Sequence, residues 1–520
     1  MIDTSEARRA HRGLASIAFA KIFFIVAGYG IQLVLPRIWT EREYGSFAAV
    51  MVTVSMLNNV LIATTIQSVS RFISQDGYST YACVRRGLSI QFVLGLVLSG
   101  SFFLLAPTIS SVLNDERLTG LLQVVASVLF SYALYATFVG ALNGMQRFQE
   151  QARLDITFSV LRTTAILGTA ALGWSVAGAV SGFAAAAFSI FLVAFLSLAP
   201  QLLHAEDQRD RAQAAPTLGT WLAFLGPIGL YQVFLNGTLQ VDLLVLKKTV
   251  AELGLLAGMG LEAAANRADE LVGRYRAAQT FAFVPYQLML SMTFIVFPRI
   301  SRATANGDRA AVRSTIEGAL RFSLLVLLAI AAPISGAADG VLLVAFPKSY
   351  VALGAPALSV LIFGLVAFAL FVVHATVLSG SGRAGTAACI AALAFVVVLV
   401  TTRLFIVAKD GMPGEMLRAT AFGTVLGMTV ALIISAGQVY SVFRTGIPIG
   451  SLMRASIAAG MAHFVSSAVP HPTRIGAFLA LAAGALTYGA GLIALRELRL
   501  EDWHALRDSL RSRTPKFESR

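Results

Sequence analysis

Long apolar runs alternate with short polar segments along almost the whole chain. A membrane-spanning helix needs about 20 mainly apolar residues, and a window of that length finds fourteen such segments. They cover 14–36, 45–67, 87–107, 119–142, 154–174, 177–200, 218–246, 273–297, 317–338, 355–378, 384–408, 416–441, 452–470 and 475–495. Backbone polar groups cannot stay unpaired in lipid, and the segments are too long for barrel strands. The pattern therefore predicts an all-α polytopic membrane protein.

The first twelve segments read as two copies of one six-helix unit. "YGSFAAV" at 44–50 aligns with "VGRYRAA" at 272–278, which pairs Gly45 with Gly273 and, further on, Arg71 with Arg299. Two other phrases recur in the same order, "APTIS" with "APIS" and "LNGMQR" with "LSGSGR". Because an even number of helices separates the copies, we expect two like lobes related by a pseudo-two-fold axis along the membrane normal. The last two segments should pack outside them.

This repeat sets the expected domain boundaries. They are an N-terminal six-helix lobe over 1–205, helices 7–11 of the C-terminal lobe over 206–410, helix 12 over 411–445, helices 13–14 over 446–497 and a cytoplasmic amphipathic tail over 498–520. The second copy also contains an insertion at 251–271, which we interpret as a short outward-facing amphipathic helix. It is either a surface decoration, since loops tolerate insertions, or a lid over a cavity mouth.

Composition agrees with a membrane location. The mean hydropathy is +0.75, with 57% hydrophobic and 13% charged residues, which excludes an ordinary soluble protein. The net charge is +13, but the basic residues are spread over short loops instead of forming a stripe, so we expect no nucleic-acid partner. Two cysteines imply no disulfide framework, and we expect neither a metal site nor a cofactor.

The distribution of Lys and Arg predicts the orientation. With the N-terminus placed in the cytoplasm, the loops on that side carry most of the basic residues, so both termini should be cytoplasmic. The first apolar segment is too long for a signal-peptide core and lacks a nearby cleavage pattern, so we expect it to be retained. We therefore expect a multi-pass protein of the cytoplasmic (inner) membrane.

The phrases "EYGSFAAV" and "VGRYRAAQTFAFVPYQLMLSMTFIVFPRIS" resemble the polysaccharide-exporter branch of the multidrug/oligosaccharidyl-lipid/polysaccharide (MOP) flippase superfamily, which includes O-antigen flippases. The resemblance covers the first twelve segments. It implies two lobes around a solvated cavity that opens alternately to each side of the membrane. It also implies basic residues in that cavity, an acidic residue near the end of the seventh helix, and a polyprenyl-diphosphate-linked glycan as cargo.

Charged residues at membrane depth are the first candidates for such a cavity, because they normally face protein or water. Lys21 either snorkels to the inner surface or points into the cavity. Arg162, followed by two threonines, should face the cavity. Asp242 matches the acidic position that the resemblance implies, and its alternative is an ion pair that pins the seventh helix to the eighth, with Lys247 or with one of the two arginines considered next.

Arg274 and Arg276 begin the predicted eighth helix and point to different faces of it. Arg274 should anchor the helix at the membrane interface. Arg276 is the candidate for contact with diphosphate or with Asp242, because a guanidinium donates two parallel hydrogen bonds. Weaker candidates, for which snorkeling or packing is the competing explanation, are Arg321, His374 and Arg403.

Uncharged residues complete the candidate set. Amides at similar depth that can bind sugars or water are Gln32, Asn58, Asn59 and Gln240. Glycines and a proline interrupt two equivalent helices, the first and the seventh, at Gly28, Gly30, Gly226, Pro227 and Gly229. Paired interruptions are typical of hinges near a transport site, and close helix packing by small residues is the alternative.

These observations predict a flippase that moves a polyprenyl-diphosphate-linked oligosaccharide, such as an O-antigen, exopolysaccharide or capsule repeat unit, by alternating access. It is expected not to be an enzyme, and the chain has no GxxxxGK[ST] loop for ATP. The alternatives are a cation-coupled multidrug exporter, a lipid II flippase and a silent scaffold. Expected partners are the lipid-linked glycan and membrane lipid, with a glycan polymerase or glycosyltransferase as candidate protein partners and the monomer as functional unit.

Overall fold

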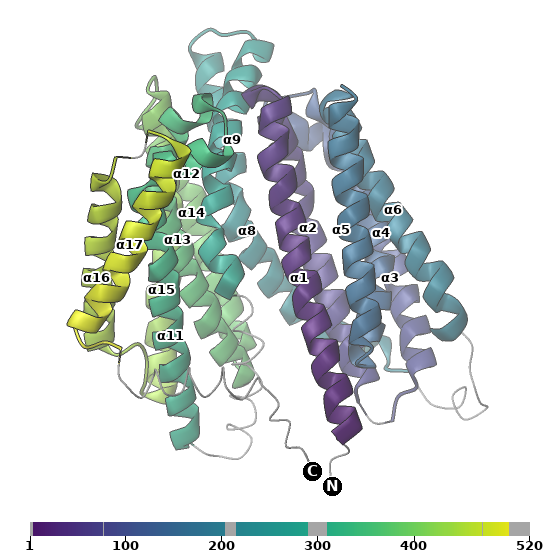
Figure 1. Cartoon of the computed structure of the whole chain (residues 1–520). Coiled ribbons are helices and arrows are strands. Elements are labelled where there is room, and N and C mark those ends of the chain that lie inside the picture. The colour runs from purple at the N-terminus through teal and green to yellow at the C-terminus, as the bar shows by residue number, and fades with distance from the viewer. Residues whose placement is uncertain (1–3, 76, 203–214, 290–308, 471, 499–520) are drawn as a thin grey trace.

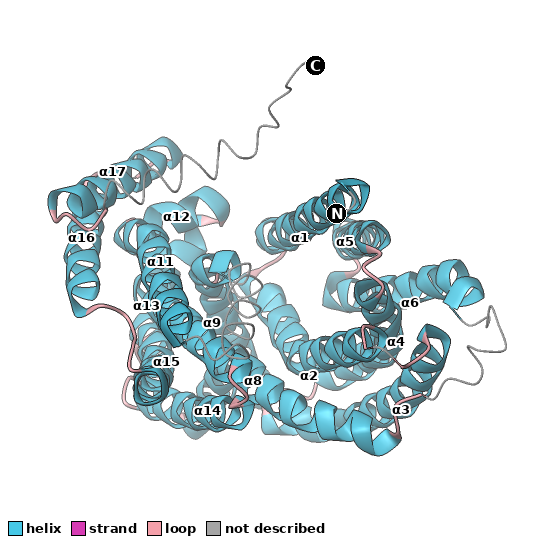
Figure 2. Cartoon of the chain, turned by 90° about the horizontal axis from the view of Figure 1, so that it is seen from below, coloured by secondary structure: helices cyan, strands magenta, loops and turns pink. Residues whose placement is uncertain are grey.

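The computed structural model describes residues 4–75, 77–202, 215–289, 309–470 and 472–498. Over these ranges the chain is helical and contains no strand (Figures 1 and 2), which confirms the predicted all-α class. Arg299 and the predicted tail helix within 498–520 lie outside these ranges, apart from residue 498.

Every predicted segment overlaps a helix. The first group is α1 (Thr4–Ile38), α2 (Glu41–Ile73), α3 (Thr80–Val112), α4 (Leu118–Gly144), α5 (Phe148–Ala171) and α6 (Ser175–Leu202). The second is α8 (Leu218–Leu256), α9 (Leu261–Ala282), α11 (Arg309–Gly336), α12 (Ala338–Ala345), α13 (Lys348–Gly380), α14 (Ala384–Val407) and α15 (Pro413–Phe443), followed by α16 (Ile449–Ala468) and α17 (Arg474–Ala494). The short α12 was not predicted.

Eleven of the described helices are long and apolar enough to cross a membrane. The predicted segments that fall short are those in α5, α9 and α16. In α5 the reason is a set of polar and charged side chains, several of which are buried inside the protein instead of facing lipid. The segment predicted at 273–297 continues beyond α9, and residues 290–297 lie outside the described ranges. The structure is that of a multi-pass membrane protein.

Equivalent helices of the two groups make equivalent contacts. Within the first group α1 packs on α5, and α4 packs on α2, α3 and α6; within the second, α8 packs on α14, and α13 packs on α9, α11 and α15. The turns at "LNGMQR" and "LSGSGR" also match. Arg147 N donates to Leu142 O and Arg383 N donates to Leu378 O, both at 2.8 Å. The residues before these arginines have left-handed φ values of 58° and 83°. The sequence repeat is therefore a structural repeat of two lobes.

The symmetry fails at one helix. The second half of α8 packs on α14 in its own lobe, whereas its start lies against the other lobe, as Figure 2 shows. Trp221, at the start of α8, is fully buried, and its ring centroid lies 4.7 Å from that of Phe72 in α2. The equivalent helix α1 has few contacts with α9. The long helix α8 therefore reaches the other lobe, and its repeat equivalent α1 makes no comparable contact in the described part of the chain.

The insertion at 251–271 is not a separate helix, which corrects the prediction. It consists of the end of α8 and the start of α9, joined by a turn at 257–260 that projects at the upper end of Figure 1. Gly258 ends α8 with a φ of 82°, a conformation that favours glycine. Consequently Arg274 and Arg276 lie in the middle of α9 instead of at its beginning. This hairpin packs on α2 of the first lobe.

The last two helices pack together and against α11, outside the two lobes, as predicted (Figure 2). At their lower end Arg321 of α11 donates to Glu497 at 2.7 Å, and Arg454 of α16 lies 3.2 Å from the same carboxylate. Glu497 is buried. In Figure 1, α1 begins and α17 ends on this same side of the molecule.

Candidate functional site

Arg162 lies between α5 and α1. Its Cζ atom is 4.4 Å from the ring centroid of Phe24 and 5.7 Å from that of Phe158, so the guanidinium is stacked on aromatic faces. The space beside Gly28 is occupied by the same guanidinium, because a Cβ there would lie 3.4 Å from an Arg162 terminal nitrogen. Arg162 therefore faces the middle of α1.

Arg276, in α9, lies one turn from a contact between α9 and that part of α1. In α9, Thr280 accepts a 3.0 Å hydrogen bond from Tyr29 of α1 through its carbonyl oxygen, and Thr280 is one turn from Arg276. Gly28 and Tyr29 are neighbours in the sequence. The part of α1 that Arg162 faces is therefore also the part that contacts α9, one turn from Arg276.

Neither of these arginines has a carboxylate within ion-pair distance among the described residues. Other candidate cations do have one. Lys21 lies 3.0 Å from Asp155, Arg403 lies 3.1 Å from Glu252 and Arg321 is held by Glu497. Among the candidate cations, Arg162 and Arg276 are therefore the two half-buried side chains whose positive charge a bound anion can neutralise.

Asp242 is fully buried and makes no ion pair with any described residue. Its carboxylate accepts hydrogen bonds from Tyr275 at 2.7 Å, Thr424 at 3.0 Å, Gln279 at 3.1 Å and the Leu243 backbone N–H at 2.8 Å. These donors come from α8, α9 and α15, so the carboxylate ties three helices of one lobe together. An ion pair with Arg274, Arg276 or Lys247, which the sequence left open, is not formed.

A hydrogen-bond chain connects Asp242 to Arg276. The Arg276 guanidinium donates to Gln279 Oε1 at 3.2 Å, and the amide nitrogen of the same glutamine donates to Asp242. Gln279 uses its acceptor toward the cation and its donor toward the acid, so its amide orientation is specified at both ends. A change at the arginine can therefore be transmitted to the buried carboxylate.

Amides line the contact between α2 and α8. Asn59 donates to Asn236 at 3.2 Å, and Ser55 donates to Gln240 at 2.7 Å. The Asn58 side chain is buried and its Oδ1 has no hydrogen-bond partner in the described part of the chain. Of the predicted polar residues, Asn59 and Gln240 therefore join the two lobes, and Gln32 accepts from Tyr44 at 2.5 Å near the upper end.

One face of α5 is polar along much of its length. Asp155, paired with Lys21, and Ser159 both precede Arg162 by about one or two helical turns. Buried side-chain atoms near it without a hydrogen-bond partner among the described residues are Gln151 Oε1, Ser159 Oγ, Thr163 Oγ1 and Tyr135 OH. Buried polar atoms of this kind are commonly satisfied by water.

The remaining predicted charges lie elsewhere. Arg274 is 3.8 Å from Glu270 on its own helix, and Arg403 is exposed beside Glu252. Arg321 fastens the outer helices to α11. His374 is fully buried in α13, and both of its ring nitrogens lack a hydrogen-bond partner among the described residues.

The predicted hinge residues lie in unbroken helices. Both α1 and α8 continue through them, including Pro227. A Cβ at Gly30 or Gly226 would meet no atom within 4 Å, and one at Gly229 would meet Thr64 only at 3.8 Å. Close helix packing therefore does not explain these three glycines in this conformation, and their role as hinges stays a prediction.

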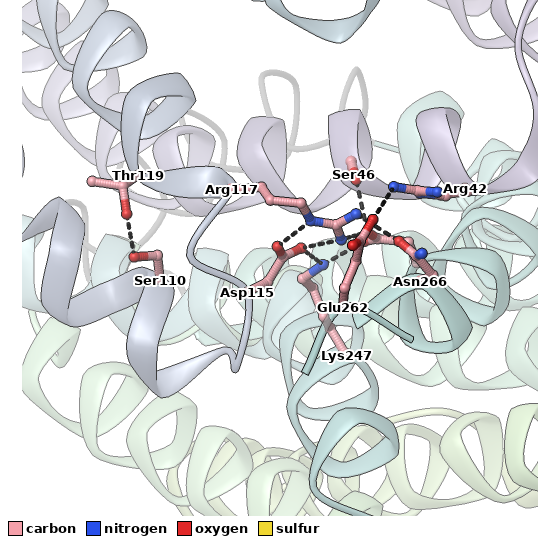
Figure 3. Close-up of polar contacts among 10 residues, drawn as sticks. Arg42, Ser46, Ser110, Asp115, Arg117, Thr119, Lys247, Glu262 and Asn266 are labelled. Carbon is pink, nitrogen blue, oxygen red and sulfur yellow. Dashed lines mark hydrogen bonds and ion pairs between the residues drawn. The ribbon is translucent and has the colours of Figure 1, made fainter. Parts of the chain in front are cut away.

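A polar network at the upper end was not predicted. Its members are Ser46, Asp115, Arg117, Lys247, Asn266 and Asp269 (Figure 3). Lys247 is fully buried and contacts both carboxylates. The sequence suggested Lys247 only as an alternative partner of Asp242. Its actual partners are distant in the sequence, and Asp269 falls in the insertion that was expected to be an outward-facing amphipathic helix.

The aligned glycines of the repeat meet beside this network. A Cβ at Gly45 would overlap the carbonyl oxygen of Asp269, and a Cβ at Gly273 would overlap that of Glu41. Each of these hypothetical carbons also falls within 3.3 Å of the backbone nitrogen of the other glycine. Glycine at both positions lets α2 and α9 approach closely, and this contact joins the lobes at the upper end.

Sequence and structure comparisons agree with this architecture. Residues 34–226 match a family model described as polysaccharide biosynthesis protein. No curated protein matches the chain. Among the described residues, no group of three or more His, Cys, Asp or Glu side chains is placed to hold a metal ion.

Solved structures with a similar fold are transporters. The lipid II flippase MurJ in an inward closed conformation is 15% identical, with a TM-score of 0.69, over 92% of this chain and 99% of that one. A MOP-superfamily transporter from Pyrococcus furiosus is 14% identical, with a TM-score of 0.59, over 84% and 96%. An outward-facing multidrug-resistance MATE transporter of the same superfamily gives the same values.

Proposed function

We propose that this chain, which has the fold of the MOP-superfamily transporters and matches a polysaccharide-biosynthesis family over residues 34–226, is a flippase for a polyprenyl-diphosphate-linked oligosaccharide. The observation that carries the proposal is one half-buried arginine in each lobe, Arg162 beside α1 and Arg276 one turn from the contact of α9 with α1, neither with a carboxylate partner in the described chain. A diphosphate is the anion that two such guanidiniums suit, because each can donate two parallel hydrogen bonds to it.

The sign of these charges also separates the proposal from its main alternative. A transporter of cationic drugs needs acidic groups available to its cargo. Here Asp242 is enclosed by four hydrogen-bond donors, and Asp155 is paired with Lys21. The groups left for cargo are basic, which favours an anionic headgroup.

The mechanism follows from the two-lobe arrangement. The lobes meet at the upper end, which we place outside the cytoplasm because α1 begins and α17 ends at the opposite end. The headgroup enters from the inner leaflet and is neutralised by one arginine from each lobe. The glycan passes between the lobes while the polyprenyl tail stays in lipid. When the headgroup binds Arg276, the change in the Arg276–Gln279 hydrogen bond alters the hydrogen bond from Gln279 to Asp242.

The first experiment measures lipid-linked sugars in membranes of a strain depleted of this protein. Leaflet location is tested with an impermeant enzyme that modifies the glycan from outside. A diphosphate-linked glycan that accumulates only in the inner leaflet is the expected result, and its chemical analysis distinguishes lipid II from a capsule or O-antigen unit. An unchanged pool that is accessible from outside would move the proposal to drug export or scaffolding.

Site variants then test the arginines. Arg162→Gln and Arg276→Gln should each fail to restore the depleted strain at equal expression, because a buried phosphate contact is lost. The matched control is Arg403→Gln, which removes an exposed guanidinium paired with Glu252 and should restore export. Full rescue by both site variants would overturn the assignment of these two residues.

A further inference from the structure

The polar network at the upper end connects the two lobes through four contacts. Lys247 lies 2.8 Å from Asp115, and Arg117 lies 2.9 Å from Asp269. Arg117 also donates to Asn266 at 2.5 Å, and Ser46 donates to Asp269 at 2.8 Å (Figure 3). In each contact one partner belongs to the first lobe and the other to the second. The two carboxylates and the lysine are buried.

The same residues also pair within each lobe. In the first lobe Arg117 holds Asp115 with two hydrogen bonds, at 2.7 Å and 3.0 Å. In the second lobe Lys247 contacts Asp269. Each lobe therefore contributes one cation and one anion that already touch each other. The four charges form a closed square, with two sides within the lobes and two sides between them.

We infer that Asp115, Arg117, Lys247 and Asp269 form a charge-balanced latch that divides into two neutral ion pairs when the lobes part. The inference rests on the proposed transport function, because alternating access requires this end to open. Opening breaks the two sides between the lobes and keeps the two sides within them. Each buried charge therefore keeps a partner of opposite sign when this end opens. Breaking most buried ion pairs is costly because it leaves a buried charge without a partner.

This arrangement makes a distinctive prediction about which pairs of charges can be removed. If the pair within the second lobe is removed, by Lys247→Met with Asp269→Asn, the first lobe keeps its neutral pair and opening becomes easier. If one charge is removed from each lobe, by Lys247→Met with Asp115→Asn, Arg117 and Asp269 remain. Opening must then separate a lone cation from a lone anion and becomes harder. Both variants lose the same number of charges of each sign.

The test is a distance measurement between spin labels at Glu116→Cys and Leu256→Cys, both exposed at the upper end. The two native cysteines are replaced, and the full chain is placed in lipid nanodiscs. We expect the ratio of long-distance to short-distance populations to be at least tenfold higher in Lys247→Met with Asp269→Asn than in Lys247→Met with Asp115→Asn. Equal ratios, or the opposite order, would overturn the latch.

A second pair of variants keeps all four charges, in case the neutral variants do not fold. Exchanging charges within the second lobe, by Lys247→Asp with Asp269→Lys, leaves each lobe neutral but places like charges opposite each other on both sides between the lobes. This end should therefore open more often than in the wild type. Exchanging them between lobes, by Asp115→Lys with Lys247→Asp, puts two cations on one lobe and two anions on the other, and should hold the end closed. Matching populations in these two variants would also overturn the inference. Because the measurement is a distance, it stands whether or not glycan export is found.

Discussion

Asp242 illustrates at the residue scale how a buried carboxylate is stabilised without a cation. Four donors from three helices surround it. Its depth in the predicted seventh helix and its acidic identity are apparent from the sequence. Its partners are not, because Tyr275, Gln279 and Thr424 are ordinary residues whose positions only the packing of α9 and α15 determines.

Substitutions at Asp242 should separate structure from transport. Asp242→Ala leaves several buried donors unpaired, so we expect it to lower the free energy of unfolding by about 3 kcal/mol. Asp242→Asn keeps an acceptor and should lose less than half of that. Thermal unfolding in detergent measures both changes. If the negative charge takes part in coupling, Asp242→Asn will fold normally and still fail to export glycan, whereas normal export by Asp242→Asn would assign the residue a purely structural role.

Gly45 supports a second prediction at this scale. Gly45→Ala places a methyl group against the backbone of α9, and such overpacking costs about 1–3 kcal/mol. Since the overlap exists only where α2 meets α9, we expect the upper end to open more often in the spin-label measurement. Gly460→Ala, in the outer helix α16, is the matched control, because its methyl group meets no atom within 4 Å. A control that opens as much as Gly45→Ala would contradict this explanation.

At the scale of elements, the helices were largely predictable and their ends were not. Each of the fourteen apolar segments overlaps a described helix, but α8 and α9 extend into residues that were predicted to form a separate insertion. Charged residues in this extension suggested solvent exposure. Instead Asp269 and Lys247 satisfy each other and the opposite lobe, a long-range arrangement that local patterns do not contain.

The element α8 also makes a prediction, because Trp221 fixes its start to one lobe while its second half is packed on α14. Any movement of the lobes must bend the part between these anchors, where Gly226 and Gly229 have open space around them. Replacing both with alanine favours a stiff helix by about 1 kcal/mol per residue. We expect unchanged or higher thermal stability together with slower export in reconstituted vesicles. Unchanged export would argue against a hinge in α8.

The docking of α17 should depend on pH through Glu497. Burial raises the pKa of this carboxyl, but hydrogen bonds from Ser451, Arg321 and Arg454 outweigh burial and hold the pKa below its usual 4.5. A lowered pKa stabilises the folded protein above pH 4.5, and this contribution is lost as the pH falls further. Glu497→Gln should therefore lower the free energy of unfolding by about 1 kcal/mol at neutral pH. The difference from wild type should disappear in acid, and a pH-independent difference would contradict the ion-pair account.

For the whole molecule, hydrophobic pattern and repeat together were enough to predict the two lobes and the outer pair of helices. They specify which segments are equivalent, and a pseudo-two-fold arrangement follows. The asymmetric position of α8 was not predictable. The hydrophobic patterns of α1 and α8 are similar, and only the start of α8 packs against the other lobe.

The orientation in the membrane is testable at this scale. A thiol at Leu256→Cys, which is 84% exposed in the α8–α9 hairpin, should react with an impermeant reagent in intact cells. A thiol at Arg444→Cys, in the loop after α15, should react only after the membrane is permeabilised. Cys389→Ser removes the exposed native cysteine from both. The reverse labelling pattern would invert the predicted topology and place both termini outside.

The crossing of Gly45 and Gly273 has a consequence for the origin of the molecule. The two glycines are equivalent residues of the repeat, and the backbone beside each one occupies the space that a side chain at the other would need. A contact in which a residue meets its own counterpart is isologous, the type found at the two-fold axis of homodimers. Two separate six-helix chains with this one glycine could have made the same contact before they were joined. The covalent link would then have freed each copy to diverge, and the one-sided course of α8 is a feature that only a fused, heterogeneous pair can have.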